Sequence, residues 1–236
     1  MSVWAPRRFW TTAGTVPAEG GGFAVQLDGK PVRTPLKAPL VLPTEGLAQA
    51  VAAEWQAVEG KVDPSVMPFT RMANSAIDKV APQFAAVAGM LAEYGGSDLT
   101  CYRAERPEGL VARQAKGWDP LLDWTAATFA APLHPTPGVM PRPQPEASLA
   151  ALSAAVHAMT PFQLAAFHDL VALSGSLVLA LAVTRGRLRA EEAWTLSRID
   201  ETWQIEEWGE DEEAAEATAR KHVDFLQADR FFALCR

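Results

Sequence analysis

Residues 191–213, EEAWTLSRIDETWQIEEWGEDEE, contain the pattern from which the fold of this chain can be inferred. At 100° per residue, Leu196, Ile199 and Trp203 lie on one stripe of a helix, which is the usual spacing of a helix that packs on a core. The stretch therefore predicts a single helix at 190–208, set within a larger helical domain.

A second apolar stripe lies roughly opposite the first, and Glu201 lies within it together with Trp194, Ile205 and Trp208. A helix that is apolar on two sides is ordinarily buried between neighbours, but a buried carboxylate is costly unless it is paired. Arg198 is three residues away and can pair with Glu201 along the helix. Two interpretations therefore stay open. Another part of the chain covers this stripe, or a partner protein contacts Glu201, Trp194, Arg198, Ile205 and Trp208.

Length and charge narrow the functional classes. With 236 residues, 49% of them hydrophobic, the chain can bury a full core, and one or two domains are expected. Residues 191–216 contain eleven acidic residues and one Arg, a local charge of −10, so the overall charge of −7 leaves +3 for the remainder. This balance offers no basic face for phosphates or for an anionic membrane, so neither nucleic acid nor a bilayer is the expected partner.

Cysteine usage and hydropathy indicate a cytoplasmic protein that does not insert into a membrane. Cys101 and Cys235 are far apart in the sequence and belong to no metal-binding or disulfide pattern. The N-terminus lacks the apolar core of a signal peptide. The most apolar run, residues 170–183, is interrupted by Ser174-Gly175-Ser176 and is too short for a span of about 20 residues. We interpret it as a central buried helix in which Gly175, Ser176 and Ala180 let a neighbouring helix approach closely.

The N-terminal sequence predicts a small β-rich domain. Residues 23–27 alternate in hydropathy, Asp28-Gly29 supplies a tight turn, and residues 30–34 return as the second strand of a hairpin. Residues 40–42 form a further short strand between prolines.

A helix follows these strands. Thr44 is the expected N-cap, and the helix ends at Gly60. The first domain is therefore predicted to span residues 1–66, and residues 67–236 form a larger, all-helical domain that contains the proposed binding face. The fold class is α+β.

From residue 70 onward helices dominate, apart from a short strand pattern at 99–102. Six prolines between 132 and 145 exclude a regular element there and indicate a stiff surface loop. The expected helices are 70–79, 82–94, 113–129, 146–157, 161–183, 190–208 and 211–234.

The sequence contains no recognisable catalytic constellation, cofactor motif or metal site. Phosphate-binding loops, dinucleotide fingerprints and nucleophile elbows are absent. Asp119 and Asp123 could share a helix face as metal ligands do, but nothing supplies further ligands. His168 and Asp169 are adjacent on a helix and are expected to point in different directions. The four histidines are scattered over separate elements: His134, His157, His168 and His222.

Several stretches, in the same order along the chain, resemble one family, the assembly chaperones that hold the free alpha subunit of the F-type ATP synthase. The segments are Arg8-Phe9-Trp10, LDGKPVRTP at 27–35, MPFTRMANSAID at 67–78, DLTCYRA at 98–104, WDPLLDW at 118–124, SLVLALA at 176–182, EEAW at 191–194 and DETWQIEEWG at 200–209. One departure from the pattern is Arg189, where a Ser or Thr cap is expected before the helix.

The resemblance implies a non-enzymatic chaperone without a cofactor. It would bind the unassembled alpha subunit, shield the surface that later meets the beta subunit, and then be displaced. The family occurs in mitochondria and in related bacteria, and the lack of a presequence favours a bacterial cytoplasm over a mitochondrial matrix. Two alternatives are a small enzyme with a carboxylate/His site formed by Asp119, Asp123 and a histidine, and a constitutive subunit of a complex.

Overall fold

The computed structural model describes residues 7–138, 140 and 142–236. The N-terminal residues 1–6, which we searched for a targeting signal, and two residues of the proline-rich stretch lie outside this description. The chain forms two compact units, each of which gathers stretches that are separate in the sequence. The first comprises residues 7–84, 160–166 and 230–236; the second comprises the described residues of 85–159 and 167–229. The sequence placed its division at residue 66, whereas the first compact unit continues to residue 84.

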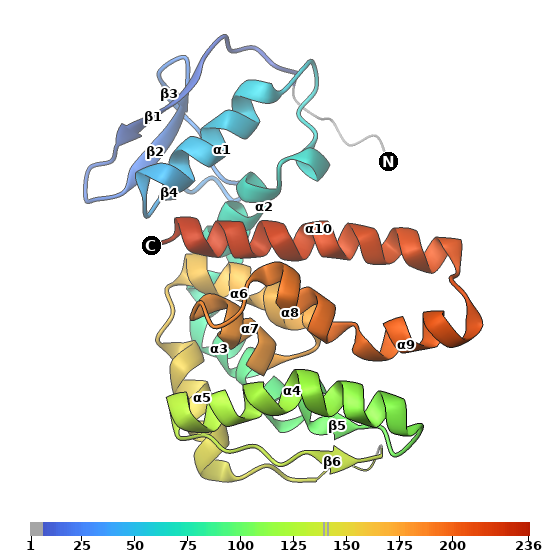
Figure 1. Cartoon of the computed structure of the whole chain (residues 1–236). Coiled ribbons are helices and arrows are strands. Elements are labelled where there is room, and N and C mark those ends of the chain that lie inside the picture. The colour runs from blue at the N-terminus through green and yellow to red at the C-terminus, as the bar shows by residue number, and fades with distance from the viewer. Residues whose placement is uncertain (1–6, 139, 141) are drawn as a thin grey trace. The chain divides into compact units, whose positions relative to one another are not determined.

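The first unit contains a small antiparallel sheet. Its central strand β2 (Phe23–Leu27) pairs with β1 (Ala13–Pro17) along one edge. Its other edge pairs with β3 (Lys30–Pro31) and, further along, with β4 (Val41–Leu42). Together with the helices of the second unit, this sheet confirms the predicted class, a small β-rich N-terminal part followed by a mostly helical remainder (Figure 1). The sequence analysis missed β1.

The predicted Asp28-Gly29 turn is present. Both residues have positive φ angles, 47° and 78°, which a two-residue hairpin turn requires. The carboxylate of Asp28 also accepts hydrogen bonds from the backbone N–H groups of Thr11 and Thr12, and these bonds lower its pKa. The turn residue therefore also fixes the segment that leads into β1.

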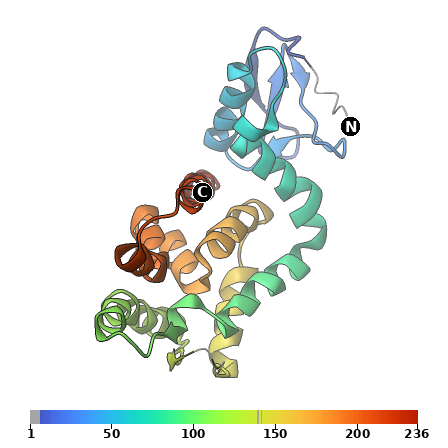
Figure 2. The same ribbon diagram turned by 90° about the vertical axis from the view of Figure 1, so that its right-hand side faces the viewer.

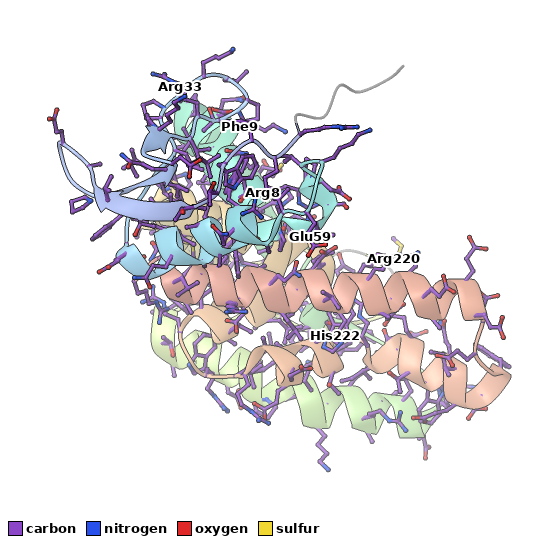
Figure 3. All side chains as sticks on the ribbon, turned by 90° about the horizontal axis from the view of Figure 1, so that it is seen from above. Arg8, Phe9, Arg33, Glu59, Arg220 and His222 are labelled. Carbon is purple, nitrogen blue, oxygen red and sulfur yellow. The ribbon has the colours of Figure 1, made fainter. Side chains whose placement is uncertain are left out.

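Helix α1 (Glu45–Ala57) packs on β1 and β2. As predicted, Thr44 is its N-cap, because the Thr44 hydroxyl oxygen accepts a hydrogen bond from Leu47 N–H. At the other end, the Arg8 guanidinium donates to the carbonyl oxygens of Gln56 and Val58 (Figure 3). Arg8 thus occupies carbonyl groups that the end of a helix leaves unpaired.

Long-range hydrogen bonds bring the N-terminal motifs together inside this unit. The carboxylate of Glu54 accepts from the N–H groups of Phe69 and Thr70, so it caps helix α2 (Pro68–Ser75), which has no side-chain cap of its own. Asp78 similarly accepts from the hydroxyl of Thr34, 2.7 Å away. The segments 27–35 and 67–78, for which the sequence analysis established only the order along the chain, are therefore in contact.

The chain continues from α2 through short irregular turns and a further helix to residue 96. The sequence predicted two helices here, at 70–79 and 82–94. Pro82 lies in a 3-10 turn at the junction, where its missing N–H would interrupt a regular helix. The elements are η1 (Pro64–Val66), π-helical η2 (Ala76–Val80), η3 (Ala81–Gln83), α3 (Phe84–Ala92) and η4 (Glu93–Gly96).

Most of the second unit is helical. Helix α4 begins at residue 108, five residues before the predicted start, because Pro107 immediately precedes it. The remaining elements are η5 (Leu99–Cys101), β5 (Tyr102–Arg103), α4 (Glu108–Phe129), β6 (Thr136–Pro137), α5 (Glu146–His157), α6 (Pro161–Ser174), α7 (Leu177–Thr184), α8 (Ala190–Ser197), α9 (Ile199–Trp208) and α10 (Glu212–Leu234). Helices α6 and α10 each supply residues to both units.

The proline-rich stretch contains one short regular element that the sequence excluded. Residues Thr136–Pro137 form β6, which pairs in parallel with β5. Gln144 exchanges two hydrogen bonds with the backbone of His134 and so joins the two ends of the stretch. Val139 and Pro141, which belong to the predicted stiff loop, lie outside the described residues.

The apolar run at 170–183 is two helices, not the single predicted one. Gly175 has φ +71°, which ends α6, and Ser176 caps α7 by accepting a hydrogen bond from Leu179 N–H. A Cβ added at Gly175 would meet nothing within 4 Å, so the prediction of close helix approach at this glycine is wrong. Its role is conformational. All eight residues of α7 are buried, as expected of a central helix.

A buried carboxylate anchors the start of α7. Asp98 is fully buried, and its two oxygens accept hydrogen bonds from the N–H groups of Thr100 and Val178 and from the hydroxyls of Thr100 and Ser176, at 2.7–3.0 Å. Burial raises the pKa of Asp98, while these donors oppose that shift. The residue therefore ties the segment before β5 to the N-terminus of the central helix.

We predict that Asp98→Ala lowers the free energy of unfolding by about 2–6 kcal/mol, because two buried backbone N–H groups lose their acceptor and each such loss costs about 1–3 kcal/mol. Urea unfolding followed by circular dichroism measures this change. The control is Asp123→Ala at an exposed position of α4, which should stay within about 0.5 kcal/mol of the parent. Equal stability of the two variants would contradict the anchoring role.

Candidate interaction surface

The predicted helix at 190–208 is interrupted at Arg198. This residue has φ −110° and ψ 17°, and it separates α8 from α9. The hydroxyl of Ser197 donates to the carbonyl oxygen of Trp194, which satisfies one acceptor at the end of α8. Helix α8 nevertheless begins at Ala190 as predicted, with Glu192 accepting from Arg189 N–H in place of the expected Ser or Thr cap. The prediction of one continuous helix was wrong.

The break places Trp194 in the interior. Its exposed fraction is 7%, and its ring stacks on that of His222 from α10, with the centroids 5.2 Å apart and the planes at 16°. The Arg198 guanidinium lies 5.0 Å from the Trp194 ring, and Glu191 lies 2.7 Å from His222 Nε2. Figure 3 shows His222 and Arg220 projecting from different sides of α10. Trp194 is therefore covered by the protein's own side chains, contrary to the shared exposed face that the sequence suggested.

One face of α9 is held against α4 by Trp203. A Cβ added at Gly109 would lie 2.7 Å from the Trp203 ring, so only glycine lets the ring approach this closely. The Arg113 guanidinium lies 4.8 Å from the same ring and donates two hydrogen bonds, 2.9 and 2.8 Å long, to the carboxylate of Glu206. These bonds lower the pKa of Glu206. A stacked, bidentate arginine fixes orientation better than a lysine could.

Further contacts extend along the same side of α4, which lies beside α9 in both views (Figures 1 and 2). Gln114 donates to the carboxylate of Asp200 at 2.6 Å. The indole N–H of Trp118 donates to the carbonyl oxygen of Leu196 at 2.9 Å. Gly117 lies against Leu196 and Ile199, so the stripe expected to pack on a core does so.

The opposite face of α9 is exposed. Glu201, Ile205 and Trp208 recur at intervals of four and three residues, so they lie on one side of the helix. Ile205 is 44% exposed and Trp208 is 79% exposed. The Glu201 side chain is 52% exposed and pairs with Arg198 at 3.0 Å, as the sequence spacing allowed. We call Glu201, Ile205 and Trp208 the outer face of α9.

The residues considered for an enzymatic site do not converge. Asp119 forms an ion pair with Arg103 at 2.7 Å, while Asp123 is exposed one turn further along α4. Within residues 7–138, 140 and 142–236, no three His, Cys, Asp or Glu side chains are grouped as metal ligands. His168 and Asp169 do hydrogen bond, at 2.9 Å, so the expectation that adjacent side chains diverge was wrong.

The residues that orient α9 were missed by the sequence analysis. Gly109 and Arg113 lie near the start of α4, and the predicted helix began only at 113. Gly109, Arg113 and Gly117 are spaced by four residues and therefore share one helix face, which is the signal that could have found them.

Comparison with known proteins identifies the family. The model of the family described as ATP12 chaperone protein matches residues 7–126. Two solved structures of Atp12 from Paracoccus denitrificans, one of them an aspartate-to-lysine mutant, are each 56% identical, with 98% of both chains covered and a TM-score of 0.95. A chaperone-like protein from Agrobacterium tumefaciens is 43% identical over 98% of this chain and 87% of its own, with a TM-score of 0.93.

A curated relative, the mitochondrial protein atp12 of Schizosaccharomyces pombe, is 26% identical over 97% of this chain and 82% of its own. The matches agree on one class of protein, the chaperones. The chain belongs to the ATP12 chaperone family, the ATP synthase assembly chaperones that its sequence motifs resemble. Among the described residues, no helix combines the length and the apolar character needed to cross a bilayer.

We predict that Gly109→Ala destabilises the protein by about 1–3 kcal/mol, because the added methyl group overlaps the Trp203 ring. Gly89→Ala is the matched control. It also lies in a helix, but its new Cβ would meet nothing within 4 Å, so it should be neutral or stabilising by up to about 1 kcal/mol. Urea unfolding of both variants tests the packing of α9, and a neutral Gly109→Ala would contradict it.

We predict a pH dependence at His168, whose pKa is raised by its hydrogen bond to Asp169. Since the folded protein binds this proton more tightly, the pair stabilises the fold below the ordinary histidine pKa. That contribution is lost as the pH rises through the higher folded value. An NMR titration of His168 should give a lower midpoint in Asp169→Asn than in the parent. Equal midpoints would show that the pair does not form in solution.

Proposed function

We propose that this protein is a non-enzymatic chaperone that binds the free alpha subunit of ATP synthase and shields its beta-facing surface until assembly. The observation that supports this most directly is the outer face of α9, where a nearly uncovered Trp lies beside an Ile and a carboxylate on a helix held rigidly from behind. Membership of the ATP12 chaperone family supports the same conclusion.

The physical basis of the proposal is the exposed apolar surface of an orphan subunit. Such a surface aggregates unless it is covered, and a holder competes for it. Trp is among the residues that most often dominate the energy of protein interfaces. A stable complex should bury about 1,200–2,000 Å² of accessible surface in total. The outer face of α9 would therefore form the centre of a larger contact. Release requires only that the permanent beta-subunit contact be larger or better packed.

The five residues that the sequence analysis proposed for partner binding divide into direct and supporting residues under this proposal. Glu201, Ile205 and Trp208 contact the client. Arg198 positions Glu201, because it also contacts the carbonyl oxygen of Leu173 and the Trp194 ring. Trp194 acts indirectly, as the buried support beneath the break between α8 and α9.

Two other functions receive less support. An enzyme acting through Asp119 and Asp123 would need converging groups, but Asp119 is engaged by Arg103 and Asp123 faces solvent. A constitutive subunit would use the same surface and differ only in the lifetime of the contact. A pull-down from cells distinguishes the chaperone from the constitutive subunit, because a chaperone should recover the free alpha subunit and not the finished ATP synthase. We propose a bacterial cytoplasmic location, since similar structures come from the bacterium Paracoccus denitrificans; the relative from Schizosaccharomyces pombe is named as mitochondrial.

We predict that Glu201→Lys weakens capture of the alpha subunit at least tenfold in Kd, because a reversed charge is placed in the contact. The fold should be nearly unchanged, since an exposed ion pair is worth about 0–1 kcal/mol. Glu59→Lys makes the same charge change at an exposed position of the first unit and should bind like the parent.

The measurements are co-elution with the co-expressed alpha subunit, titration of binding, and thermal unfolding. Unchanged binding by Glu201→Lys, or an unfolded variant, would refute the assignment of this residue. Trp208→Ala should also weaken capture, whereas Val66→Ala, at another exposed apolar side chain, should not.

A further inference from the structure

We infer that the outer face of α9 selects a client surface with a basic rim, and that the acidic residues around Trp208 accelerate capture of that client. This inference rests on the proposed function and specifies the chemistry of the partner. Under this inference, Trp208 holds the bound client, and the acidic residues attract it before binding.

Acidic residues are concentrated at the C-terminal end of α9, in the connection that follows it and at the start of α10. We call Glu207, Glu210, Asp211, Glu212 and Glu213 the acidic rim. All five are exposed, and the interval 207–213 contains no Lys or Arg. Among the ion pairs of the described part of the chain, none involves a rim residue. Five carboxylates thus lie within five residues along the chain of an indole that is 79% exposed.

Helix stability accounts for only part of this arrangement. Asp211 accepts a hydrogen bond from Ala214 N–H, and Glu212 and Glu213 lie in the first turn of α10, where negative charge is favourable. Glu207 lies in the last turn of α9, which contains no basic residue, and negative charge is unfavourable there. Helix capping therefore does not account for Glu207.

The charge of the rim disfavours a second copy of this chain as the occupant of the face. A two-fold contact would bring the same patch of both copies together, and like charges placed opposite each other cost several kcal/mol. Anionic membranes and nucleic acids are repelled for the same reason. A protein surface with an apolar pocket for Trp208 and a basic rim satisfies both features of the face.

Charges at the edge of a contact act mainly on the rate of encounter. They raise the association rate constant and make it dependent on salt, while the buried side chains at the centre determine the dissociation rate. The effect weakens when the Debye length shortens, from about 30 Å at 0.01 M to about 8 Å at 0.15 M ionic strength. Trp208 and the rim should therefore change different rate constants.

The test measures association and dissociation of the full-length protein with the free ATP synthase alpha subunit over a range of NaCl concentrations. The rim variant combines Glu207→Gln, Glu210→Gln, Glu212→Gln and Glu213→Gln. Its matched control, which has the same net charge, combines Glu19→Gln, Glu59→Gln, Glu93→Gln and Glu146→Gln at exposed positions elsewhere. Circular dichroism confirms that both variants are folded.

We expect the rim variant to associate about tenfold more slowly at low salt, within the range of known steering effects. Its dissociation should be nearly unchanged, the control should follow the parent, and the difference should vanish at high salt. A rim variant that associates as fast as the parent, or a parent rate that does not depend on salt, overturns the inference but leaves the chaperone function standing. A parent that does not bind the alpha subunit at any salt concentration overturns both, and dimerisation of the chaperone through this face overturns the choice of occupant.

Discussion

Trp203 packs against the bare backbone of Gly109, and the arrangement of α9 depends on this contact. Arg113 lies over the same ring and also binds Glu206, so the indole contacts both the backbone at Gly109 and a guanidinium. Together with the hydrogen bond from Gln114 to Asp200, these contacts commit one face of α9 to α4. The remaining face, with Ile205 and Trp208, is largely exposed. Because these contacts already order α9, its exposed face is preorganised, and little conformational entropy is lost when a partner binds.

The interruption at Arg198 gives the two halves of the signature stretch different roles. Before it, Trp194 is buried against His222 and Phe225 from α10 and stabilises the helical unit. After it, Trp208 remains exposed. A straight helix would have placed both indoles on the same side. The break therefore separates internal packing from the surface that we propose binds the client, and Arg198 itself links the two through the Trp194 ring and Glu201.

Local sequence chemistry predicted the elements of the fold well wherever a strong signal was present. The Asp28-Gly29 turn, the Thr44 cap and helix α5 follow from turn geometry, capping and periodicity, and the structure confirms them. Strand β1 was missed because AGTVP has little alternation of hydropathy. Two of the long predicted helices, 161–183 and 190–208, were each divided in the structure, at Gly175 by a positive φ angle and at Arg198 without any glycine or proline signal.

The candidate surface could be predicted only in part from the sequence. Periodicity placed Glu201, Ile205 and Trp208 on one stripe, but it could not show that the break removes Trp194 from that stripe. Nor could it show which residues hold α9 in place, since the contact between Gly109 and Trp203 joins positions 94 residues apart (203 − 109). Long-range packing of this kind depends on the tertiary fold and leaves no local pattern. Family likeness identified the class of protein, and the structure supplied the geometry.

The most direct test of the central claim is oxidative footprinting of the tryptophans, with and without the bound alpha subunit. Trp208 is exposed in the free protein, and Trp194 is buried in the same chain and serves as an internal reference. The account predicts that binding strongly reduces oxidation of Trp208 and leaves the low oxidation of Trp194 unchanged. If Trp208 is oxidised equally fast in the complex, the client binds elsewhere and the outer face of α9 is not the binding surface.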